Sequence, residues 1–224
     1  MWTFHARATR SVSYAITKLS SFIPQVTTLV INSTNEKVLH VPMVPNKFFH
    51  LKYLEINLCA SVTLSPAFDY LSLVSFLDAS PVLESFILRV SQDDMKHDSA
   101  FDGGSASHMW EMPEHKHDWL KNVQIIGFCS AKSMVELICH ILKNATSLES
   151  LELDPVCENE DYDDIGRCSV GKNDKCGCGP ITKRMKLEAR KALKAVKRYI
   201  VGKVPPTVEL DVREPCSRCH VIEL

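Results

Sequence analysis

A short apolar phrase with the spacing leucine-x-x-leucine-x-leucine recurs along the chain, and stretches with the periodicity of amphipathic helices lead up to it. Its five copies are Val26/Leu29/Ile31, Leu51/Leu54/Ile56, Leu83/Phe86/Leu88, Leu120/Val123/Ile125 and Leu148/Leu151/Leu153. A repeated strand and helix cannot bury its apolar face alone and must stack on its neighbours. The pattern therefore predicts a stack of strand-helix units that share one core.

The predicted fold class is α/β: an irregular leucine-rich-repeat solenoid of about five to six strand-helix units, with a mostly parallel sheet on one face and helices on the other. The middle apolar residues of the five copies are separated by 25, 32, 37 and 28 residues. Because regular repeats keep a spacing of about 20 to 29 residues, the longer units must carry surface insertions. We expect a single domain over residues 1–224, with a polar insertion at 92–118, an acidic and cysteine-containing loop at 155–180, and a capping helix and strand at 183–213.

Periodicity and capping residues place helices between the strands. Ser65 and Pro66 are typical of a helix start, and an inward apolar stripe follows at Leu73, Val74 and Leu77. The spacing of Ser133 and Glu136 predicts a capping box at the start of a later helix that ends at Asn144. Its apolar face comprises Met134, Ile138, Ile141, Leu142 and Ala145.

The two ends of the chain complete the stack. An N-terminal helix face runs into the first repeat strand, although the basic and acid-free first 35 residues also have the composition of a transit peptide. That face comprises Val12, Ala15, Ile16 and Leu19. The last helix ends at Gly202, and Val208, Leu210 and Val212 then alternate as a sixth strand that covers the terminal apolar layer. The face of that helix comprises Met185, Ala189, Ala192, Leu193, Val196 and Ile200.

Side chains that alternate with the buried leucines point outward from the sheet, because successive residues of a strand face opposite sides. This surface is mixed in character, without a basic stripe or an aromatic ladder, and therefore favours a protein ligand over a nucleic acid. The residues that we expect to bind a protein partner are Tyr53, Glu55, Asn57, Ser85, Ile87, Arg89, Asn122, Gln124, Ile126, Glu152 and Asp154.

Composition narrows the class of protein further. The chain has 224 residues, of which 45% are hydrophobic and 24% charged, with a formal net charge of -1. No apolar run reaches the roughly 18 to 20 residues that span a bilayer, so we expect no membrane partner. Without a secretory signal, the nine cysteines are expected to be thiols in an intracellular protein, cytoplasmic or nuclear, that is not secreted.

Several phrases resemble one known family. They are NKFFHLKYLEI at 46–56, ASPVLESF at 79–86, LKNVQIIGF at 120–128, ILKNATSLESL at 141–151 and PPTVEL at 205–210. These phrases are similar to the leucine-rich-repeat region of plant F-box proteins, particularly grass members with an FBD-like C-terminal region. In that family the repeats hold the substrate of a ubiquitin ligase and an N-terminal F-box joins a Skp1-type adaptor. The stretch before Val26 is too short for an F-box of about 40 to 50 residues, so we expect no Skp1-type adaptor to bind this chain.

Cysteines near the C-terminus suggest an alternative function. A zinc-stabilised binding protein would use two close pairs of thiolates, because tetrahedral zinc takes four such ligands. The available pairs are Cys176 with Cys178 and Cys216 with Cys219. The spacing of the first pair is tight for one metal, and a helix and a strand separate the two pairs. Loop and tail cysteines without a metal are the favoured reading, and no cofactor is expected.

Three further patterns carry weaker signals. A near-match to a phosphate-binding loop ends at Lys172 and Asn173, where the hydroxyl that would ligate magnesium is missing. A polar cluster in the 92–118 insertion could gather a metal, although a solvated loop is the simpler interpretation. Its members are Glu111, Glu114, His115, His117 and Asp118.

Because no nucleophile or carboxylate pair stands in a recognisable catalytic pattern, we expect that the protein is not an enzyme. The basic helix from Lys183 to Lys203 is interpreted as a solvated outer wall.

Overall fold

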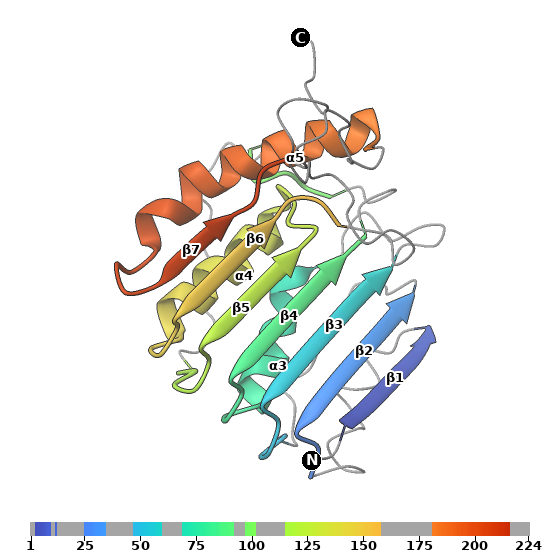
Figure 1. The fold of residues 1–224 in the computed structure, drawn as a ribbon, viewed down its shortest axis with the longest axis vertical. Coiled ribbons are helices and arrows are strands. Elements are labelled where there is room, and N and C mark those ends of the chain that lie inside the picture. Colours follow the sequence, from blue (N-terminus) through green and yellow to red (C-terminus); the bar gives the residue numbers. More distant parts are fainter. Residues whose placement is uncertain are drawn as a thin grey trace, which may run out of the picture.

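The computed structural model describes residues 3–9, 12, 25–34, 47–59, 69–91, 97–101, 115–157 and 181–215. In these residues, one parallel sheet of seven strands has its strands in chain order (Figure 1). The strands are β1 (Thr3–Thr9), β2 (Thr28–Thr34), β3 (Tyr53–Cys59), β4 (Ser85–Val90), β5 (Asn122–Ile126), β6 (Ser150–Asp154) and β7 (Glu209–Val212). Parallel strands in chain order arise when one strand-helix unit stacks on the next, so the predicted α/β solenoid is confirmed.

The recurring apolar phrases lie in register across the sheet. Leu29, Leu54, Phe86, Val123 and Leu151 are aligned partners on successive strands, and their side chains are buried. The expected closing strand is also present, because β7 pairs in parallel with β6. The alternation of apolar and polar residues along the chain therefore predicts correctly which side of each strand faces the core.

Backbone hydrogen bonds at the start of the strands show that the units are equivalent despite their unequal lengths. The carbonyl groups of Thr27, Lys52, Glu84 and Lys121 each accept bonds from two consecutive amides of the next unit. Charges of opposite sign also alternate along this edge. Lys52 Nζ lies 2.7 Å from Glu84 Oε1, and Lys121 Nζ lies 3.5 Å from Glu149 Oε1. Insertions therefore change the connections between units and leave the start of each strand unchanged.

Helices cover one face of the sheet in the described part of the chain. The 3-10 helix η2 (Tyr70–Leu73), α3 (Val74–Ala79) and α4 (Lys132–Asn144) lie behind the strands in Figure 1. Beyond β7 lies α5 (Lys183–Ala195), which continues through the π-helical η3 (Val196–Ile200) and the 3-10 helix η4 (Val201–Lys203). Leu73, Val74 and Leu77 are buried as predicted. The helix start expected at 65–66 lies outside the described residues.

The start of α4 differs from the predicted capping box. Its N-cap is Ala131, which makes no side-chain capping bond. Ser133 lies inside the helix, where its Oγ accepts a hydrogen bond from the backbone amide of Tyr70 at 3.2 Å. The prediction was wrong because a partner from another unit, η2, takes the serine hydroxyl. The predicted end at Asn144 is correct.

Strand β1 is an element that the apolar pattern did not predict. Phe4 aligns with Leu29 of β2 and packs against the core. The next two alternate positions in the sequence are Ala6 and Ala8, so β1 lacks the bulky residues that mark the other strands. Of the apolar helix face expected after it, Val12 is buried in the core, and the remaining members lie outside the described residues.

Part of the polar insertion is tied to the rest of the molecule. Ala100 donates its backbone N–H to the carbonyl of Ser130 at 2.8 Å, and the Tyr199 hydroxyl donates to the carbonyl of Ala100 at 3.1 Å. His117 also lies in this insertion, and its side chain is buried rather than solvated. Among the described residues, no helix is long and apolar enough to cross a membrane.

Candidate functional sites

The outward side of the sheet carries the side chains that the sequence predicted for partner binding. Arg89 and Asn122 are exposed. Those that are half-buried are Tyr53, Glu55, Asn57, Ser85, Ile87, Gln124 and Glu152. In the described part of the chain, no helix covers this side in Figure 1. The outward side of β2 to β7 is hereafter called the open face.

Two predicted binding residues do not offer accessible surface. Ile126 is 9% exposed and Asp154 is 4% exposed. Oδ1 of Asp154 accepts the amide of Val156 at 3.0 Å, and its backbone carbonyl accepts the amides of Gly127 and Phe128. Both residues are the last of their strands. The expectation that Ile126 and Asp154 line the binding surface is therefore wrong.

A carboxylate organises the open face over β2, β3 and β4. Glu55 accepts hydrogen bonds from the Tyr53 hydroxyl at 2.7 Å, from Arg89 Nε at 3.2 Å and from Asn57 Nδ2 at 3.3 Å. Asn57 Nδ2 also donates to Oδ1 of Asn32 on β2 at 2.8 Å. Contacts between neighbouring strands thus hold these polar side chains in place. We call Asn32, Tyr53, Glu55, Asn57 and Arg89 the Glu55 network.

The Glu55 network shifts the pKa of two of its members. Burial raises the pKa of Tyr53 to about 12, and the hydrogen bond to Glu55 acts in the same direction. Burial alone would raise the pKa of Glu55, but hydrogen bonds from Tyr53 and Asn57 and the charge of Arg89 hold it below its usual value. Glu55 is therefore an ionised acceptor at neutral pH.

A second polar group spans β5, β6 and the end of β7. Gln124 Nε2 donates to Glu152 Oε2 at 2.9 Å, and Arg213 Nε lies 2.6 Å from Glu152 Oε1. Ile87 lies between the two polar groups, because β4 pairs it with Glu55 on one side and with Gln124 on the other. The open face therefore presents a half-exposed apolar side chain between two ordered polar networks.

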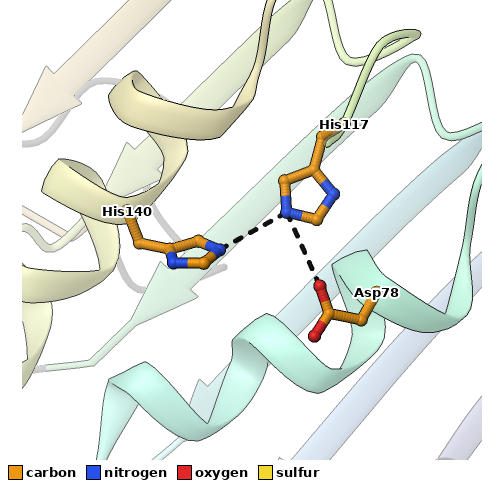
Figure 2. A group of neighbouring side chains, drawn as sticks. All are labelled: Asp78, His117 and His140. Atoms are coloured by element: carbon orange, nitrogen blue, oxygen red, sulfur yellow. Dashed lines mark hydrogen bonds and ion pairs between the residues drawn. The ribbon is translucent and has the colours of Figure 1, made fainter. Parts of the chain in front are cut away.

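A cluster of a different kind lies on the helical side of the sheet. Asp78 near the end of α3, His117 in the loop before β5, and His140 on α4 point toward one another (Figure 2). His117 Nε2 lies 3.5 Å from His140 Nε2 and 3.7 Å from Asp78 Oδ1. One ligand atom from each residue lies within 4.8 Å of the others. We call these residues the His-Asp cluster.

Burial makes the imidazoles of the His-Asp cluster uncharged at neutral pH. The pKa of His117 is lowered to about 4, chiefly by burial and then by His140 and His115. Burial, aided by Lys143, also lowers the pKa of His140. The pKa of Asp78 is raised, again chiefly by burial. Two neutral imidazoles and a carboxyl group are the donor types that first-row transition metals prefer.

Only some of the residues of the polar insertion that could gather a metal lie in or beside this cluster. His117 joins it, and His115 Nδ1 lies 3.4 Å from the other carboxylate oxygen of Asp78. Asp118 instead accepts a hydrogen bond from the Thr146 hydroxyl at 2.7 Å, and positions 111 and 114 lie outside the described residues. No short sequence motif could have linked Asp78 and His140 to His117, because they lie 39 and 23 residues from it in the chain.

Comparison with known proteins places the chain in a family. Residues 1–217 match the family described as "At1g61320/AtMIF1, LRR domain". The chain belongs to this leucine-rich-repeat (LRR) family. No curated protein and no solved structure matches the chain significantly. The family match agrees with the parallel sheet, and it extends over all seven strands.

Glu188 of the LRR domain has a structural role that the sequence did not reveal. This acidic residue of the basic helix α5 accepts hydrogen bonds from the amide and hydroxyl of Ser130, at 2.8 and 2.7 Å, and lies 3.1 Å from His97 Nε2. Burial alone would raise its pKa, but these partners lower it to about 2. Glu188 therefore joins α5 to the loop between β5 and α4.

Two cysteines of the LRR domain lie in its core. Cys129 and Cys139 are buried in the core as expected, and burial raises the pKa of the Cys129 thiol to about 12. A thiol with so high a pKa is a poor nucleophile. The alternative zinc site at Cys176, Cys178, Cys216 and Cys219 lies outside the described residues, as does the Lys172 loop.

Proposed function

We propose that the LRR domain is a non-enzymatic protein-interaction module that acts inside the cell, in the cytoplasm or nucleus, and binds a protein partner on its open face. The Glu55 network is the observation that carries the proposal. It orders polar side chains from three units before any partner arrives, so that less side-chain entropy is lost on binding. The LRR family membership of the chain supports the same conclusion.

Charge on the open face favours a protein as the partner. Among the described outward side chains, the acidic Glu55, Glu152 and Asp211 are interspersed with the basic Arg89 and Arg213. A nucleic-acid surface would need clustered positive charge to meet the phosphates. A mixed surface with an apolar residue near its centre fits the polar rim and apolar contact typical of protein interfaces.

Substitutions on the open face test this proposal. Ile87→Glu places a charge at the centre of the face, and Arg89→Ala removes a donor of the Glu55 network. Lys194→Glu on the exposed side of α5 serves as the matched control. Each variant is checked for folding by circular dichroism and thermal unfolding, and is then used as bait for quantitative affinity purification from plant extract.

We expect partners of the wild-type chain to be recovered at least tenfold less with Ile87→Glu, at an unchanged level with Lys194→Glu, and at an intermediate level with Arg89→Ala. The reason is that truncating or charging a central interface residue costs about 2 kcal/mol or more, whereas distant surface charges contribute little. Folded Ile87→Glu protein that recovers the same partners in the same amounts would contradict the proposal.

A finer form of the proposal rests on the resemblance to F-box proteins. In that form, the bound partner is a protein destined for ubiquitination, and the LRR domain supplies substrate recognition without contacting a Skp1-type adaptor. We expect no complex when residues 1–224 are mixed with purified Skp1-type adaptor and analysed by size-exclusion chromatography. Co-elution would show that this chain itself carries an adaptor-binding surface.

A further inference from the structure

We propose that Asp78, His117 and His140 form a binding site for one divalent transition-metal ion of the zinc class on the helical side of the sheet. This inference is independent of the open face and of its partner. The site would draw its ligands from α3, from the loop before β5 and from α4, and so from separate units of the stack. A water molecule would supply the fourth ligand.

Two of the three distances within the His-Asp cluster are close to those of a tetrahedral metal site. A zinc ion bonds to imidazole nitrogen at about 2.0 to 2.1 Å, so two ligand atoms around it lie roughly 3.3 to 3.4 Å apart. His117 Nε2 lies 3.5 Å from His140 Nε2 and 3.7 Å from Asp78 Oδ1. Shifts of a few tenths of an ångström, on side chains that already point at one another in Figure 2, would bring these two pairs to that separation. The ligand atoms of all three residues lie within 4.8 Å of one another.

The donor set selects the class of ion. Imidazole nitrogen suits zinc, copper, nickel and cobalt, whereas magnesium and calcium prefer an all-oxygen shell. Two imidazoles and one carboxylate, from three separate elements, are brought together here. One carboxylate would also offset part of the charge of the ion.

The two carboxylate oxygens of Asp78 can take different roles, one as a metal ligand and the other as a contact to the outer shell. Asp78 Oδ1 is buried without a hydrogen-bond partner, while its other oxygen lies 3.4 Å from His115 Nδ1. His115 would thus orient the carboxylate and leave Oδ1 for the ion, as outer-shell partners do in known sites. The side chain of Asp78 is 25% exposed and that of His117 is 5% exposed, so the cluster lies just below the surface.

Asn144 joins α4 to the loop that carries His117. Its Nδ2 donates to the backbone carbonyl of His140 at 3.0 Å and lies 3.3 Å from His140 Nδ1. The backbone carbonyl of Asn144 accepts the amide of His117 at 3.0 Å. These contacts hold the two histidines next to each other.

Without a metal, the same side chains leave polar groups poorly satisfied. The contact between His117 and His140 is 3.5 Å long, at the limit for a hydrogen bond, and His117 Nε2 can direct its proton to only one of two neighbours. Asp78 Oδ1 then has no donor within hydrogen-bond distance. A cation at the centre would satisfy all three groups at once.

Cobalt titration of the full chain tests the site. The four C-terminal cysteines Cys176, Cys178, Cys216 and Cys219 are first replaced by serine, so that thiolates there cannot bind the probe. Tetrahedral Co²⁺ with nitrogen and oxygen ligands absorbs in the visible range, whereas thiolate ligation adds a strong near-ultraviolet band. Zinc competition, elemental analysis of the dialysed protein and the thermal midpoint with and without Zn²⁺ complete the measurement.

We expect one equivalent of Co²⁺ to bind with visible bands and no thiolate band, Zn²⁺ to displace it, and Zn²⁺ to raise the thermal midpoint. His140→Gln and Asp78→Asn should each weaken binding at least a hundredfold. His50→Gln, the same substitution at an exposed histidine outside the cluster, should bind as wild type. Both ligand variants keep side-chain size close to the original, and circular dichroism of the metal-free proteins establishes that they fold.

Three results would overturn the site. The first is a serine-substituted protein that folds and binds no stoichiometric Co²⁺ or Zn²⁺. The second is binding that is unchanged in folded His140→Gln and Asp78→Asn. The third is binding in the original chain that shows a thiolate band and disappears with the cysteine substitutions, which would place the metal at the C-terminal cysteines.

Discussion

The two sides of the sheet use the same strands for different purposes. On β4, Phe86 is fully buried against the helices, whereas its neighbour Ile87 is half-buried on the open face between two polar networks. Burying a large apolar side chain contributes several kcal/mol to stability, while a half-exposed polar contact contributes about 1 kcal/mol or less. The helical side therefore holds the fold together, and the open face contributes less to stability.

Polar groups also behave differently on the two sides. Glu55 and Arg89 meet within reach of solvent, where an ion pair is screened and weak. On the helical side, Glu188 and His117 are largely removed from water, and their pKa values move to about 2 and about 4. Buried polar groups in this protein thus affect stability and its pH dependence, whereas polar groups on the open face chiefly order a surface.

The largest expected difference between the two sides concerns adjacent residues of one strand. Phe86→Ala should lower the free energy of unfolding by about 3 to 5 kcal/mol, because it opens a cavity in the core. Ile87→Ala should lower it by less than about 1 kcal/mol. Urea unfolding followed by circular dichroism measures both. Equal losses for the two variants would show that the open face is part of the core.

A second prediction concerns the turn after β5. Gly127 has a φ of 82°, and a Cβ at this position would lie 2.0 Å from the carbonyl oxygen of Val90. Gly127→Ala should therefore cost more than about 2 kcal/mol of unfolding free energy. Gly202 is the matched control, because a Cβ there meets no atom within 4 Å. Gly202→Ala should change stability by less than about 1 kcal/mol in the same urea experiment.

A third prediction concerns pH and the His-Asp cluster in metal-free protein. The pKa of His117 is about 4 in the folded chain against an ordinary 6.5, so the unfolded chain takes up this proton first. The contribution to stability is complete above pH 6.5 and is lost as the pH falls toward 4. Between pH 7.5 and 5 the loss should be about 1 to 2 kcal/mol.

Urea unfolding in the presence of a chelator, at pH 7.5 and pH 5, measures this loss. His117→Gln removes the titrating group, so its stability should vary less between the two pH values than that of the wild type. His50→Gln should leave the wild-type dependence unchanged. If His117→Gln and wild type lose the same free energy, burial of His117 is not the source of the acid sensitivity.

The smallest effect is expected on the open face. Arg89→Ala removes the 3.2 Å contact with Glu55 and should lower the free energy of unfolding by about 0.2 to 1 kcal/mol. The loss should shrink in 1 M salt, where exposed charges are screened. Lys52→Ala, at the exposed pair with Glu84, provides the comparison. A loss of several kcal/mol would assign the Glu55 network a structural role.

The recurring leucines made most of the fold predictable. Their spacing identified β2 to β6 and the alternating pattern identified β7, because buried parallel strands need apolar residues at fixed positions. Strand β1 was missed because the alternate positions after Phe4 are alanines, and its place depends on pairing with β2. The capping box failed at Ser133 for a similar reason, since the partner of its hydroxyl is 63 residues away in the chain.

The candidate sites were likewise predictable from the sequence only in part. Alternation along a strand determined which side chains face outward, including Glu55, Ile87 and Arg89, because that rule is local to the strand. Only the stacked units decided that Ile126 and Asp154 are covered. The sequence by itself thus determined the repeat, its register and its outward face. The tertiary structure alone decided the meeting of Asp78, His117 and His140, because the distance between units depends on packing and not on positions along the chain.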